Sequence, residues 1–172
     1  FVRWWWPRRR KVAIMDVTSS TNTRTVIAVP LHCTPCGHKS PTLTPSNRNQ
    51  VLPVTTVLNS FAFDFLVRLR LGGNSLIWAV LAESPFIKRQ PSIESWFAQF
   101  SARLGIPNDL FSPQWLRLQQ SSSLPLKAGW ALTDAQRITM RAESDALAFA
   151  ALSLSEADVA DVRQAQSFRL TQ

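Results

Sequence analysis

The chain has 172 residues, of which 45% are hydrophobic, so it can bury one sizeable core. The sequence has no run of roughly 20 apolar residues, as a membrane span requires, and no apolar core of a secretory signal. Two cysteines exclude a disulfide framework and favour a cytoplasmic location. Because the first residue is Phe1 rather than Met, we expect a fragment of a longer protein.

The formal net charge of +8 is distributed unevenly along the sequence. Residues 1–90 hold 12 Lys and Arg against 3 Asp and Glu, whereas residues 91–172 hold 7 against 8. A basic half joined to a neutral half is typical of a polyanion-binding face with a separate structural or docking part. We therefore predict a binding domain over residues 1–90 and an extension over residues 91–172. Solvated surface charge alone is the alternative explanation.

The first eleven residues combine three tryptophans with a cationic run at residues 8–11. In a nucleic-acid-binding protein, the cations would contact phosphates while the indoles stack on bases. The alternative is a strand cut out of its parent, whose tryptophans once met a core. A membrane-surface role is disfavoured, because no amphipathic helix accompanies these aromatic residues.

Two β-branched runs follow, over residues 11–17 and 24–29, with a turn-rich Ser/Thr/Asn segment between them. They predict a hairpin or two neighbouring strands, closed by Pro30. Farther along, residues 76–81 form a short apolar run that predicts another strand.

The segment over residues 32–38 contains two His and two Cys, which are zinc-ligand types. Structural zinc sites usually take their second ligand pair from a distant segment, but the sequence has no other His or Cys. His32 and Cys33 are also adjacent, so both reaching one ion would be strained. A polar loop is therefore favoured over a metal site.

One amphipathic helix is predicted over residues 57–71, because apolar residues recur there at helical spacing. Asp64 and Arg68 are four residues apart in the order that favours an ion pair. The predicted N-cap is Thr55 or Thr56. Left-handed glycines are expected to end this helix. The apolar positions are Leu58, Phe61, Phe65 and Leu69, and the glycines are Gly72 and Gly73.

The second half predicts helices. A periodic apolar face over residues 92–104 follows a possible Ser92 cap, and a short helical turn is expected over residues 108–118. Thr133 and Gln136 form a capping box before an Ala-rich helix that extends to about residue 152, and a last helix begins near residue 155.

Three segments resemble segments of one protein family and occur in the same order along the chain as in that family. They cover residues 11–30, 57–90 and 133–158. The most specific wording is Leu-Asn-Ser-Phe-Ala-Phe-Asp-Phe over residues 58–65 and Arg-Ala-Glu-Ser-Asp-Ala-Leu over residues 141–147. These segments resemble the target-recognition and C-terminal region of type IIG-like restriction–modification DNA methyltransferases. Two departures occur: Met15 stands where an arginine is expected, and Leu152-Ser153 stands in place of Tyr-Gly.

The resemblance implies a target-recognition-like α+β fold, with a small mixed sheet and a central helix in residues 1–90. A mostly α-helical extension over residues 91–172 would pack against this domain or against a missing N-terminal methyltransferase domain. The parent would be a prokaryotic S-adenosylmethionine-dependent DNA adenine-N6 methyltransferase that flips its target base. The Asn-Pro-Pro-Tyr/Phe motif, the glycine-rich opening of that domain and a nuclease pattern are absent from the sequence. We therefore expect no catalysis and no cofactor or metal in this chain alone.

The expected partner is double-stranded DNA, read specifically in a groove. Predicted phosphate contacts are Arg8, Arg9, Arg10, Lys11, Arg24, Lys39, Arg68 and Arg70, with backbone N–H groups from Gly72, Gly73 and Asn74. Predicted base readers are Asn22, Arg24, Asn47, Arg48, Asn49 and Gln50. The alternatives are a protein–protein interaction module with a basic face and a non-functional gene fragment.

Overall fold

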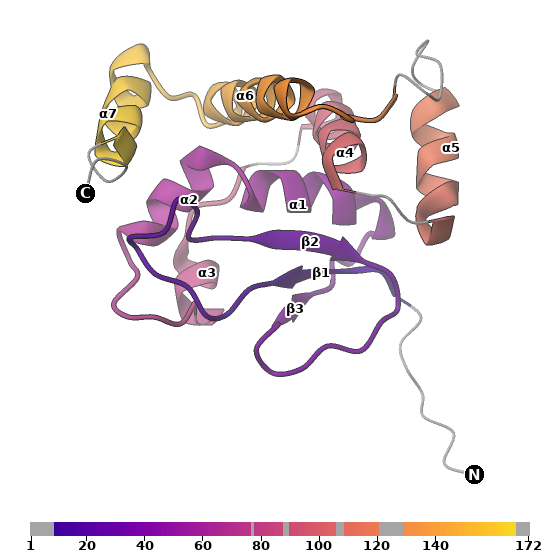
Figure 1. Cartoon of the computed structure of the whole chain (residues 1–172), viewed down its shortest axis with the longest axis horizontal. Coiled ribbons are helices and arrows are strands. Elements are labelled where there is room, and N and C mark those ends of the chain that lie inside the picture. The colour runs from indigo at the N-terminus through magenta and orange to yellow at the C-terminus, as the bar shows by residue number, and fades with distance from the viewer. Residues whose placement is uncertain (1–8, 77, 88–89, 106–108, 121–128, 168–172) are drawn as a thin grey trace.

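The computed structural model describes residues 9–76, 78–87, 90–105, 109–120 and 129–167, with residues 165–167 described by their backbone alone. It has an α+β fold in which helices cover one face of a small sheet (Figure 1). The strands are β1 (Lys11–Ile14), β2 (Ala28–Leu31) and β3 (Thr42–Leu43), in the order β2-β1-β3.

Both strand pairings are antiparallel, so the prediction of a mixed sheet is wrong for the described strands. Val12 of the central strand lies opposite Pro30 on one side and Leu43 on the other. β2 follows β1 along the chain without an intervening helix, as is usual for antiparallel neighbours, and the chain then crosses to the other side of β1 to form β3.

The predicted β1–β2 pairing is confirmed, but β2 begins at Ala28, four residues later than expected, and runs past Pro30. The start is delayed because the backbone N–H groups of Thr25 and Val26 bind the Asp64 carboxylate instead of a strand. Pro30 is tolerated within β2 because this strand lies at the edge of the sheet, where its missing N–H breaks no pairing.

The predicted single helix over residues 57–71 is wrong, because the helical conformation is interrupted at Asn59 and Ser60. The Ser60 hydroxyl accepts the Phe63 N–H and starts a new helix, while the Asn59 side chain binds the backbone of Ala28 in β2. The resulting elements are η1 (Arg48–Gln50), α1 (Val51–Leu58) and α2 (Phe61–Arg68).

Other details of this helix also differ from the prediction. Thr55 and Thr56 are not N-caps: both are buried within α1, where their hydroxyls donate to carbonyls one turn earlier. Leu69 is 67% exposed rather than part of an apolar face. Helix α2 ends before the two glycines, and neither of them adopts a positive φ.

The predicted strand over residues 76–81 is wrong, because residues 78–81 lie in α3 (Trp78–Glu83). Among the described residues, this segment adds to the sheet only through the isolated bridge between Val17 and Ser75. The consecutive side chains of Val80 and Leu81 pack against the sheet core, whereas Trp78 is 45% exposed. Short apolar runs do not distinguish a strand from a helical turn, which explains the error.

The predicted helices of the second half are confirmed. They are α4 (Pro91–Gly105), η2 (Asp109–Phe111), α5 (Ser112–Gln120), α6 (Asp134–Ala151) and α7 (Glu156–Ser167). The capping box of Thr133 and Gln136 is present at the start of α6, as predicted. The C-terminal end of α6 has left-handed Ser153 at φ 56°, with backbone bonds from Ser153 and Leu154 to Ala150 and Phe149.

The helical extension packs directly on the first half of the chain, which was one of its two expected roles. Helix α4 lies against α1, and α6 contacts both α4 and α2 (Figure 1). Val57 of α1 shares an apolar cluster with Phe97, Phe100 and Met140 from α4 and α6. The division into two domains near residue 90 stays a prediction.

Within the described residues, none of the helices is by itself long and apolar enough to cross a membrane. The bent pair formed by residues 48–58 and 61–68 passes the same length and composition criteria together.

Candidate nucleic-acid interface

The structure separates the predicted DNA-binding residues into two groups at opposite ends of the sheet. One group lies where β1 begins, and the other surrounds the loop that follows β1 (Figure 1). Arg8 lies outside the described residues. The first group contains Arg9, Arg10, Lys11, Arg48, Asn47, Asn49 and Gln50; the second contains Asn22, Arg24, Lys39, Arg68, Arg70, Gly72, Gly73 and Asn74.

The first group is completed by Arg117 of α5. Burial lowers the pKa of the half-buried Arg10 guanidinium, and the neighbouring charges of Arg117 and Arg48 lower it further, while Cys33 acts in the opposite direction. The Arg10 Nε is buried without a hydrogen-bond partner among the described residues. We call the set Arg9, Arg10, Lys11, Arg48 and Arg117 the basic edge.

Sequence reasoning missed Arg117, because it lies in the near-neutral half of the chain, 107 positions after Arg10. Its Nη1 donates to the Oδ1 of Asn49 at 2.7 Å, which ties α5 to η1. Asn47 caps η1 by accepting the Asn49 N–H. The predicted base readers of residues 47–50 therefore lie beside the cations of the basic edge.

The second group is built around a fully buried carboxylate. Asp64, with 0% exposure, accepts the N–H groups of Thr25 and Val26 through Oδ1, both at 2.7 Å. Its Oδ2 accepts a hydrogen bond from the Nε of Arg68 at 2.6 Å, which confirms the predicted ion pair. Asp64 thus joins α2 to the segment that precedes β2.

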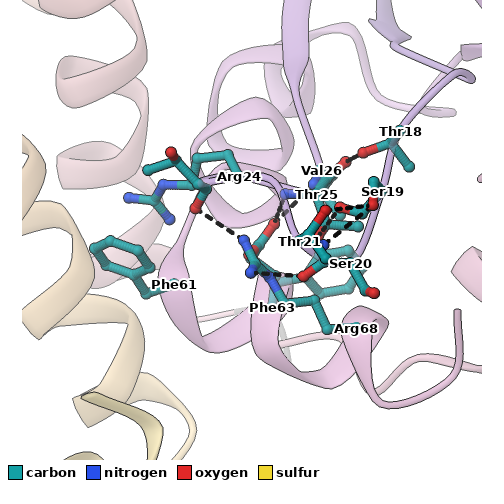
Figure 2. Close-up of polar contacts among 12 residues, drawn as sticks. Thr18, Ser19, Ser20, Thr21, Arg24, Thr25, Val26, Phe61, Phe63 and Arg68 are labelled. Carbon is teal, nitrogen blue, oxygen red and sulfur yellow. Dashed lines mark hydrogen bonds and ion pairs between the residues drawn. The ribbon is translucent and has the colours of Figure 1, made fainter. Parts of the chain in front are cut away.

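Arg68 is held inside this network rather than presented to solvent. Its guanidinium donates to the carbonyl oxygen of Ser20 at 3.2 Å (Figure 2) and to that of Thr23 at 2.8 Å. The side chain is only 8% exposed. A phosphate would have to replace partners that Arg68 already has, so we assign this residue to holding the 18–25 loop.

Arg24 has a comparable structural role. Its guanidinium lies 3.3 Å from the centroid of the Phe61 ring (Figure 2), and its Nη2 is 3.3 Å from Asp145 Oδ2 in α6. Asp145 Oδ1 accepts the Phe61 N–H at 2.7 Å, at the start of α2. These contacts join the two halves of the chain.

The electrostatic environment of this pair follows from its burial. Burial lowers the pKa of Arg24, while the charges of Asp145 and Asp64 act in the opposite direction. Burial likewise raises the pKa of Asp145, and the charge of Arg24 opposes that change. A buried, paired guanidinium is typical of a structural contact.

The remaining members of the second group are exposed: Asn22, Lys39, Arg70, Gly72, Gly73 and Asn74. Arg70 donates to the Leu66 carbonyl, and the Asn74 carbonyl accepts the Thr18 N–H. Lys39 forms an ion pair with Asp16 at 3.3 Å. Contact of these residues with DNA stays a prediction.

The His/Cys segment forms a loop at the end of β2. The His32 ring packs edge-to-face on Phe111, with 6.2 Å between centroids. In the part of the chain that the structure describes, no three His, Cys, Asp or Glu side chains lie close enough together to hold a metal ion.

No family model, curated protein or solved structure matches this chain. The chemistry of the site therefore rests on its own residues.

Proposed function

We propose that this chain binds duplex DNA through the basic edge, as the target-recognition part of a prokaryotic restriction–modification DNA methyltransferase. The observation that carries the proposal is the convergence of Arg10, Arg48 and Arg117 from three segments far apart in the sequence. Like charges held together repel one another, so a fold that gathers them is typical of a site for a polyanion.

Arginine suits this role because its planar guanidinium donates two parallel hydrogen bonds to phosphate oxygens. Arg9 and Arg48 are exposed, and Arg10 and Lys11 are half-buried at the start of β1. Phosphate contacts by these cations would fix the register of the duplex. Gln50 and the exposed Asn49, next to Arg48, would then face base edges in the groove.

The resemblance of the sequence supports the larger setting. In that setting, a separate N-terminal domain binds S-adenosylmethionine and methylates an adenine that is flipped out of the duplex. This chain supplies recognition and holds no cofactor of its own. The packing of α4 and α6 against α1 and α2 gives the recognition surface a rigid support.

The proposal is tested by measuring the affinity of the full chain for random-sequence duplex DNA between about 50 and 200 mM salt. Each phosphate contact contributes about 0.9 to the slope of log affinity against log salt. Arg48→Gln should therefore reduce the slope by about 0.9, and Arg48→Gln with Arg117→Gln by about twice that. Arg163→Gln, which removes an exposed arginine from α7, is the matched control and should leave the slope unchanged.

Two results would refute the proposal. One is the absence of duplex binding at low salt by a chain whose fold is verified by circular dichroism. The other is an equal loss of slope in the Arg48 and Arg163 variants, which would show diffuse attraction rather than contact at the basic edge. Salt-sensitive binding to polyglutamate without duplex binding would instead support the protein-interaction alternative.

A further inference from the structure

A second cationic region lies away from the basic edge, in a pocket of about 380 Å³. The pocket is lined by residues of β2, α1, α4 and α6, where the two halves of the chain meet. Its volume falls within the range of about 300 to 1,000 Å³ that is usual for small-molecule sites. Its polar lining includes Arg24, Arg137, Arg141, Ser101, Asn59 and Asp145, and we call it the arginine pocket.

The charge of the arginine pocket is positive. Three arginines and a single carboxylate, Asp145, line the pocket, and the Asp145 oxygens already bind Arg24 and the Phe61 N–H. Arg137 and Arg141 are one helical turn apart on α6, so both side chains lie on the same face of that helix. An anion in the pocket would neutralise charge that Asp145 leaves uncompensated.

Two buried donors in this region have no partner among the described residues. They are the Nη1 of Arg24 and the Oγ of Ser101, and Ser101 is only 6% exposed. Buried donors are usually hydrogen-bonded, because leaving one unpaired is unfavourable. Both residues line the pocket, so a small shift of the side chains that cover these two atoms would let an oxygen-bearing ligand accept hydrogen bonds from them.

The remaining wall is apolar. Ala28 and Pro30 of β2 and Leu104 of α4 supply aliphatic surface on the pocket lining. An apolar wall with a few convergent polar groups is typical of a site that orients a small organic molecule. Inorganic ions alone would leave that surface uncovered.

We propose that the arginine pocket binds a small organic anion, with a carboxylate or phosphate group held by the arginines and Ser101 and a short apolar body against β2. The basic edge lies at η1 and α5, outside this pocket. The proposal is therefore independent of the proposed DNA-binding function.

The test is an NMR titration of the full chain with phenyl phosphate, benzoate and benzyl alcohol, which share one ring and differ in charge. The two anions should shift backbone amides of Ala28 and Ser101, whereas the neutral alcohol should bind at least tenfold more weakly. The tighter of the two anions identifies the preferred oxyanion, and preference for either one supports the proposal.

Variants then locate the binding. Arg137→Gln with Arg141→Gln should weaken anion binding at least tenfold, because two charge-assisted hydrogen bonds are lost. Ser101→Ala should weaken it about fivefold. Arg163→Gln on α7 and Ser95→Ala on the exposed side of α4 are the controls and should leave the affinity unchanged. Thermal unfolding verifies that each variant is folded.

The proposal is overturned if neither anion shifts pocket amides, if benzyl alcohol binds as tightly as benzoate, or if the controls weaken binding as much as the pocket variants. It is also overturned if the Arg137 and Arg141 double variant lowers duplex affinity as much as the Arg48 and Arg117 double variant. In that case, the pocket would belong to the DNA contact.

Discussion

Removing the Asp64 carboxylate should strongly destabilise the fold. Asp64→Ala would leave the N–H groups of Thr25 and Val26 buried without an acceptor. Each unsatisfied N–H group lowers the free energy of unfolding by about 1 to 3 kcal/mol. The substitution would also leave Arg68 without its closest partner, and breaking a buried pair costs about 3 to 5 kcal/mol. Because Arg68 keeps two carbonyl partners, we expect about 4 to 6 kcal/mol in total.

A double-mutant cycle separates the two parts of this contribution. Asp64→Asn keeps an oxygen for the two N–H groups but turns an amide donor toward Arg68, so we expect a loss of about 2 to 4 kcal/mol. Arg68→Met leaves a buried carboxylate with two N–H donors, and we expect about 3 kcal/mol. The double variant should lose at least about 1 kcal/mol less stability than the sum of the two single-variant losses. The reason is that the amide donor introduced at position 64 no longer faces the Arg68 cation.

The measurement is urea unfolding followed by the fluorescence of the seven tryptophans, with the midpoint and slope fitted together. Asp161→Ala, at an exposed position in α7, is the control and should change stability by no more than about 0.5 kcal/mol. If Asp64→Ala lowers the free energy of unfolding by less than about 1 kcal/mol at an unchanged slope, the buried network does not hold the 18–25 loop.

Three further predictions concern the junction and the last two helices. Asp145→Ala should lower the free energy of unfolding, measured in urea, by about 2 to 4 kcal/mol, because it leaves the Phe61 N–H and Arg24 without their acceptor. An unchanged stability would show that these contacts do not hold the two halves of the chain together. Ser153→Gly should stabilise the protein by about 0.5 to 1 kcal/mol, since glycine adopts the observed positive φ without strain, and an unchanged or lower thermal midpoint would count against this. Hydrogen bonds from Ser155 lower the pKa of Asp158, so its contribution should be present above the ordinary value of 3.8 and be lost as pH falls through the lower folded-state pKa. The stability difference between wild type and Asp158→Asn should therefore shrink in acid, and a difference that stays constant from neutral pH to pH 2 would exclude this linkage.

The helical parts of the fold were predictable because their signals are local. The capping box of Thr133 and Gln136 predicts the start of α6, and the helical spacing of apolar residues over 92–104 predicts α4. The break at Ser60 was missed because the apolar pattern continues across it without proline or glycine. Ser60 caps α2 at the point where the preceding Asn59 binds Ala28 of β2, and this tertiary contact has no local signal in the sequence.

The candidate site was predictable only in part, for a related reason. Arg9, Arg10 and Lys11 form a visible run, but the nearness of Arg117 depends on how α5 packs beside η1. The pairing of Arg24 with Asp145 spans 121 positions and has no local signature. Charge counting identifies a basic half, whereas only the fold distinguishes an arginine that is buried and paired from one that faces solvent.

The outer edge of β2 has a consequence for the behaviour of the protein in solution. A strand at the edge of a sheet usually offers free N–H and C=O groups to any other strand that approaches. The outward positions of β2 are Ala28 and Pro30, since Ile27 bonds inward to β1. Asn59 occupies both backbone groups of Ala28, at 3.0 and 2.8 Å, and Pro30 has no N–H to donate. These two positions therefore offer no free N–H group to an approaching strand, and Asn59→Ala would leave both backbone groups of Ala28 without this partner.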